Sequence, residues 1–117
     1  DLPLFLGPDE FVGEMTVKYN EINKILKKEL MQIGTISLSS RLSWEIYTNN
    51  QMQILLGKEE GSSISKKLNI LIENYQVILS ELKSRVDYVD IRYKDGFVVK
   101  KLNEKLYKIN KEKKTAL

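Results

Sequence analysis

Carboxylates are the side chains of this 117-residue chain that could support acid–base chemistry. Glu59 and Glu60 are neighbours in a polar stretch typical of a solvated loop. Asp87 and Asp90 are three positions apart, so in a strand they point to opposite faces and cannot form an acid–base pair. The chain has no His and no Cys, which excludes an imidazole base, a thiolate nucleophile and the usual zinc sites. We therefore predict that the chain is not an enzyme and has no catalytic residue, metal site or cofactor.

A second group of residues is suited to binding rather than to catalysis. Tyr88, Arg92 and Tyr93 are close in sequence, and Tyr and Arg are the residues that most often supply binding hot spots. Asp95-Gly96 follows, a dipeptide that accepts the positive φ angles of a two-residue hairpin turn. The pattern predicts a C-terminal hairpin with a free sheet edge. The alternative is an ordinary strand with polar residues on its wet face.

The elements that position these residues are predicted from the spacing of apolar side chains. Steps of three and four predict a helix over about residues 9–32. The period then changes to two, which predicts strands over residues 42–47 and 51–56, joined by a turn at Asn49-Asn50.

Trp44, the single Trp, is predicted to be a core residue. It alternates with polar neighbours and shares one strand face with Leu42 and Ile46. Ile36 and Leu38 indicate a further strand before this one.

The second half of the chain repeats the order of helix and strands. Residues 64–82 have a helical apolar spacing, which we interpret as a helix laid on a sheet because it is too short for a coiled coil. Residues 86–93 and 97–100 are predicted strands. Residues 102–117 are predicted to be a basic, flexible tail. Residues 1–101 are thus predicted to be one α+β domain, with two helices packed on an antiparallel or mixed sheet that ends in a C-terminal hairpin with an exposed edge strand.

The net charge of +3 belongs to the C-terminal end of the chain. Residues 101–117 hold six Lys against two Glu, whereas residues 1–100 hold 13 basic and 14 acidic side chains. A nucleic-acid-binding domain usually has a basic face on the fold itself. A small basic RNA-binding or ribosome-associated α+β domain that uses the tail is therefore the less favoured alternative, and we expect no nucleic-acid partner.

No apolar run in the chain approaches the roughly 20 residues needed to span a bilayer. The opening residues Asp1-Leu2-Pro3 also lack the features of a signal peptide. We expect an internal fragment whose membrane anchor lies upstream.

Four segments, in the same order, follow the pattern of one known family. They are Leu-Pro-Leu-Phe-Leu-Gly-Pro at residues 2–8, a Ser-Trp strand with an Asn turn and a Leu-Gly-Lys exit over residues 39–58, Lys67-Leu68 and Tyr75 in the second helix, and Tyr-Val-Asp-Ile-Arg-Tyr-Lys-Asp-Gly at residues 88–96. Together they resemble the C-terminal periplasmic β-domain of the bacterial cell-division proteins FtsQ (DivIB), over about residues 2–99.

The resemblance implies a single-pass inner-membrane protein at the division septum, with a periplasmic POTRA module before this domain. It implies no enzymatic activity. The domain would bind periplasmic segments of FtsB and FtsL, with other divisome proteins, and help to recruit and regulate septal peptidoglycan synthesis. In the family a segment of FtsB pairs as a strand with the last strand of the domain, which predicts contacts here at Arg92, Tyr93 and Gly96.

The predicted partner-binding site extends this contact along the hairpin. It comprises Arg92, Tyr93, Asp95, Gly96, Phe97, Val98 and Val99. Main-chain groups of the free edge would supply affinity, while the side chains of Tyr93 and Phe97 would supply specificity. Arg92 could pair with an acidic group of the partner.

Two departures from the family pattern bear on the partner contacts rather than on the fold. Asp95 stands where family members often have Ser before the Gly. Lys100 and Lys101 lie where some members have Trp.

Overall fold

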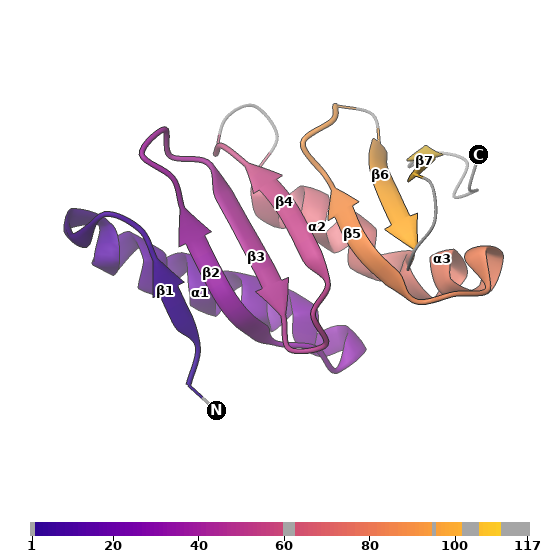
Figure 1. Ribbon diagram of the computed structural model, residues 1–117, viewed down its shortest axis with the longest axis horizontal. Coiled ribbons are helices and arrows are strands. Elements are labelled where there is room, and N and C mark those ends of the chain that lie inside the picture. Colours follow the sequence, from indigo (N-terminus) through magenta and orange to yellow (C-terminus); the bar gives the residue numbers. More distant parts are fainter. Residues whose placement is uncertain (1, 60–62, 95, 102–105, 111–117) are drawn as a thin grey trace.

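In the part of the chain that the structure describes, seven strands form one mixed sheet in which each strand lies beside the next one in sequence (Figure 1). The computed structural model describes residues 2–59, 63–94, 96–101 and 106–110, the last of these by their backbone. The strands are β1 (Leu4–Leu6), β2 (Ile33–Leu38), β3 (Trp44–Thr48), β4 (Gln53–Gly57), β5 (Val86–Asp90), β6 (Gly96–Lys101) and β7 (Leu106–Asn110). The helices are α1 (Val12–Leu26), α2 (Ile64–Glu73) and α3 (Tyr75–Leu82), with 3-10 turns η1 (Asp9–Phe11) and η2 (Lys27–Glu29).

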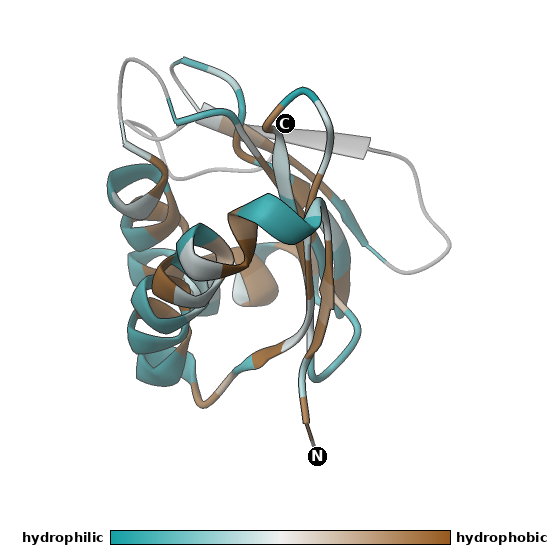
Figure 2. Cartoon of the chain, turned by 90° about the vertical axis from the view of Figure 1, so that its left-hand side faces the viewer, coloured by the Kyte–Doolittle hydropathy of each residue, from teal (hydrophilic) through white to brown (hydrophobic). Residues whose placement is uncertain are grey.

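A row of apolar side chains crosses the sheet and forms the centre of the core. Its fully buried members are paired from strand to strand: Ile36, Ile46, Ile54, Val89 and Val99. The helices pack against this face and lie on one side of the sheet (Figure 2). Burying one such side chain stabilises the fold by roughly 1.5–3 kcal/mol. The predicted α+β class, with helices on one face of a mixed sheet, is confirmed.

The neighbouring row belongs to the opposite face of the sheet, because successive residues of a strand point to opposite sides. It pairs Ser37 with Glu45, Glu45 with Leu55, Leu55 with Asp90, and Asp90 with Val98. This face is mixed in polarity, as expected for a sheet with one wet side.

The first predicted helix is shorter than expected. It ends at Leu26, and η2 follows until Leu30 takes a left-handed conformation with φ 60°. Gly34 lies inside β2. The helical apolar spacing continues past Leu26, but Ile33 belongs to the sheet.

The second predicted helix is two helices. Asn74 separates α2 from α3 with φ −105° and ψ 4°, outside the helical range. Its side-chain amide donates a hydrogen bond of 2.7 Å to the carbonyl oxygen of Ile70. Asn competes with helical main-chain bonding in this way.

The prediction for Trp44 is confirmed, but that for Leu42 is wrong. Trp44 is buried, and the Nζ atom of Lys18 lies 5.6 Å from its ring centroid. Leu42 has φ 64° and is 45% exposed, because it belongs to a turn in which its N–H donates to Ser39. The strand therefore begins at Trp44.

The C-terminal hairpin is confirmed, with two corrections. Its register pairs Asp90 with Val98, so the connection between β5 and β6 is longer than the predicted two-residue turn. Residues 106–110, which fall in the predicted tail, form β7 and pair along β6. The strand predicted to be the free edge of this hairpin is therefore an inner strand, because the outward main-chain groups of β6 pair with the segment that follows it.

Candidate partner-binding site

The predicted binding residues lie where β5 leaves the sheet. Ile91 is buried, and its N–H donates a hydrogen bond of 3.1 Å to the carbonyl oxygen of Leu55, so the chain stays attached to β4. Arg92, Tyr93 and Lys94 then project outward as exposed residues. Tyr93 is 49% exposed, which is high for a large aromatic residue beside a core.

Arg92 is held by the last residue of β5. Its Nε and Nη2 atoms donate hydrogen bonds of 2.9 and 2.8 Å to the two carboxylate oxygens of Asp90. Its main-chain N–H also donates to Asp90 Oδ1, at 3.0 Å. The Asp90 side chain is only 4% exposed, so its charge requires such a partner. The hydrogen bond with Asp90 raises the pKa of Arg92 above its usual value.

Half of the Arg92 side chain remains in solvent despite this pairing. It is 53% exposed, and a guanidinium has five N–H donors, of which Asp90 uses two. The remaining donors are available to a carboxylate of another chain.

Gly57 provides the surface on which Arg92 lies. Its φ of +79° is strained for any residue with a side chain. A Cβ atom here would also lie 2.9 Å from Cγ of Arg92. The glycine at the end of β4 is therefore required both by the backbone and by the aliphatic stem of Arg92.

Two hollows flank the loop that contains Arg92 and Tyr93. A small cavity of about 50 Å³ lies between α2 and the loop, lined by Lys66, Lys67, Ile70, Ile91, Tyr93, Lys94, Gly96 and Phe97. A wider cleft of about 390 Å³ lies over the end of the sheet, and Arg92, Trp44 and Glu45 are among its lining residues. Three lysines beside apolar side chains suit a partner segment that is both acidic and apolar.

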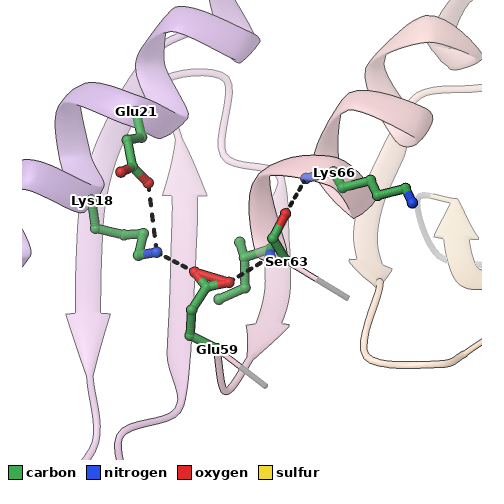
Figure 3. Close-up of polar contacts among 6 residues, drawn as sticks. Lys18, Glu21, Glu59, Ser63 and Lys66 are labelled. Carbon is green, nitrogen blue, oxygen red and sulfur yellow. Dashed lines mark hydrogen bonds and ion pairs between the residues drawn. The ribbon is translucent and has the colours of Figure 1, made fainter. Parts of the chain in front are cut away.

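The helix that lines the small cavity is fixed at its N-terminus (Figure 3). Ser63 Oγ accepts the N–H of Lys66 at 3.1 Å, and Glu59 Oε1 accepts the N–H of Ile64 at 2.7 Å. Lys18 of α1 pairs with the other oxygen of Glu59. These contacts join α1, the loop before α2 and the first turn of α2.

Glu59 is an exposed loop residue, as predicted, and its carboxylate in addition has fixed partners. Burial alone would raise the pKa of Glu59, but the hydrogen bonds from Ile64 and Lys18 and the charge of Lys18 outweigh it and lower the pKa. The carboxylate acts as a helix cap and an ion-pair partner.

The hairpin residues divide into buried and exposed positions. Phe97 and Val99 are 3% and 0% exposed and belong to the core. The predicted role of the Phe97 side chain in specificity is therefore wrong, and any contact there is through the backbone. Val98 and Gly96 are half-buried, while Asp95 lies outside the described residues.

Sequence reasoning missed Gly57, Asp90 and Lys66 as parts of this site. The signal for Asp90 was its distance of two residues from Arg92, which places both on one face of a strand. No sequence signal joined Gly57 or Lys66 to the hairpin, because both come from segments remote in the chain.

Comparison with known proteins assigns the family. The family described as "Cell division protein FtsQ/DivIB, C-terminal" matches residues 1–92. This chain belongs to the FtsQ/DivIB family. The cell division protein FtsQ of Neisseria gonorrhoeae is 33% identical over 99 residues, which cover 85% of this chain and 40% of that protein. FtsQ of Escherichia coli is 30% identical over 101 residues, which cover 84% of this chain and 36% of that protein.

The match to FtsQ covers one part of the longer relatives. The chain spans about two fifths of the length of these proteins. Within its described residues, no helix has both the length and the apolar character needed to cross a membrane. The resemblance to FtsQ that the four sequence segments indicated is confirmed, and with it a place among the cell-division proteins.

Proposed function

We propose that this chain is a non-enzymatic protein-binding domain of the bacterial divisome. It binds the periplasmic segments of FtsB and FtsL and helps to recruit and regulate septal peptidoglycan synthesis. Its place is the periplasmic face of the inner membrane at the septum, with a membrane anchor elsewhere in the full protein.

The main support for strand addition is the pairing of β6. This strand accepts a complete antiparallel neighbour along Gly96 to Lys100, here from the same chain. The C-terminal end of the sheet is thus competent to bind an extended segment through main-chain hydrogen bonds, the mode known as β-augmentation.

Specificity is proposed to come from the loop before β6. Tyr93 is exposed, and Arg92 retains free donors while its stem is fixed over Gly57. Tyr and Arg that are rigidly presented lose little conformational freedom on binding, which favours their use as hot spots. An acidic residue of the partner would pair with Arg92 or with the lysines of the small cavity.

The experiment that tests the proposed function is a calorimetric titration with the isolated periplasmic segments of FtsB and FtsL. We expect saturable binding of the FtsB segment, with NMR shift changes concentrated in residues 92–99. A single-stranded RNA oligonucleotide, titrated over a range of salt concentrations, is the control ligand. Absence of FtsB binding, together with strongly salt-dependent binding of RNA, would support the alternative of a nucleic-acid-binding domain.

A further inference from the structure

The outer side of β6 is occupied by a segment of the same chain. β7 pairs with β6 in five consecutive register positions, from Gly96 with Asn110 to Lys100 with Leu106. On its other side β6 pairs with β5 (Figure 1). Each N–H of β6 that points away from β5 can donate to one strand only, so a second strand cannot use it at the same time.

β7 is peripheral to the domain. Within the described residues, β6 is the one element along which it lies extensively. The family match ends at residue 92, before both strands. Its surroundings in sequence are lysine-rich, with six Lys and two Glu over residues 101–117.

The strand is therefore suited to be displaced. Each main-chain bond of a ladder contributes little net stability, because water competes for the same groups. A partner strand that forms the same ladder and also contacts Tyr93 and Arg92 gains these side-chain contacts in addition to the main-chain bonds.

We propose that residues 106–110 are a built-in competitor for the partner strand, which must displace β7 from β6 in order to bind. The inference rests on the proposed function and adds a form of self-regulation to it. The apparent affinity for the partner is lowered by the fraction of molecules in which β7 is docked. A change that releases β7 therefore strengthens binding without altering a partner contact.

The first part of the test asks whether β7 is docked in solution. The full chain with Tyr107→Pro and Lys108→Pro removes two adjacent N–H groups, one of which faces β6 because strand N–H groups alternate in direction. The matched control is the full chain with Thr115→Pro and Ala116→Pro, beyond β7. Amide hydrogen exchange should accelerate at the outward N–H groups of β6 in the first variant and stay unchanged in the control. Equal exchange in the native chain and both variants would overturn the proposal.

The second part measures binding of the FtsB periplasmic segment to the same three proteins. The Tyr107→Pro, Lys108→Pro variant should bind about tenfold more tightly than the native chain, with the control unchanged. Accelerated exchange with unchanged or weaker binding would show that the partner uses the outer side of β7 or another surface, which overturns this inference and leaves the proposed function standing. Failure of all three proteins to bind would overturn the proposed function, and the competition with it, whatever the exchange data report.

Discussion

The guanidinium of Arg92 closes over the buried carboxylate of Asp90 through two hydrogen bonds, and only Ile91 lies between the two residues in the chain. The same carboxylate accepts the Arg92 main-chain N–H, which turns the backbone away from the sheet at the end of β5. One acidic side chain therefore both ends the strand and fixes the direction of the residue that follows.

We predict that Arg92→Ala lowers the free energy of unfolding by about 2 kcal/mol, because it leaves the Asp90 carboxylate buried without its charged partner. Arg85→Ala is the matched control: Arg85 is equally exposed at 53%, but its partner Asp87 is 28% exposed. Loss of that pair should cost about 0.5 kcal/mol or less. Urea denaturation of both variants measures the difference, and equal midpoints would contradict the structural role of Arg92.

Gly57→Ala should destabilise the chain by roughly 1–3 kcal/mol, since the new Cβ forces both a left-handed backbone and a shift of Arg92. The control is Gly13→Ala in α1, where an added Cβ meets no atom within 4 Å. That change should stabilise the helix by roughly 0.5–1 kcal/mol. Thermal unfolding of the two variants should therefore move in opposite directions; a Gly57 variant as stable as the native chain would show that the end of β4 is not constrained.

Glu59→Gln should lower the melting temperature near neutral pH, because it weakens the link from Lys18 to the first turn of α2. The folded state lowers the pKa of Glu59 below its usual value of 4.5, so its contribution is present above that pH and is lost as the pH falls through the lowered pKa. The gap between the variant and the native chain should therefore close in acid. Glu81→Gln, on the exposed side of α3, is the matched control because it removes the same charge. A gap for Glu59→Gln that is independent of pH would exclude the capping role.

Much of the fold was predictable because the side chains of the core row occupy alternate positions along their strands. Ile46 lies between Glu45 and Tyr47, Ile54 follows Gln53, and a register that pairs Ile46 with Ile54 buries both. Trp44 was assigned to the core for the same reason. The family could also be identified from short motifs because they occur in order along one chain.

Other features of the fold depend on individual hydrogen bonds and backbone conformations, which the spacing of apolar residues does not reveal. Alternation continues through residues 86–93, but the strand ends at Asp90, where a side chain replaces the ladder as the bonding partner of Arg92. Leu42 keeps the apolar period while its backbone adopts a turn. The apolar pattern of β7 is too short to be recognised as a strand. Main-chain bonding to β6 requires no particular side chains, so the sequence gives no other signal of this pairing.

The binding site stays a prediction, although the structure corrects the expected role of one of its residues. The side chain of Phe97 was expected to supply specificity, and the β5–β6 connection was expected to be a two-residue turn. The actual register pairs Val99 with Val89 of the core row and places Phe97 on the same buried face. Tyr93 and Arg92 are exposed, and their role in partner binding stays a prediction.

The loop before β6 is proposed to recognise the partner, and Tyr93→Ala tests this role most directly. Tyr47→Ala is the matched control, since Tyr47 is 41% exposed against 49% for Tyr93 but lies on β3. In calorimetric titrations with the FtsB periplasmic segment, Tyr93→Ala should weaken binding by about 2 kcal/mol, roughly thirtyfold, with Tyr47→Ala close to the native chain and both variants folded. Native affinity in a folded Tyr93→Ala variant would contradict the claim.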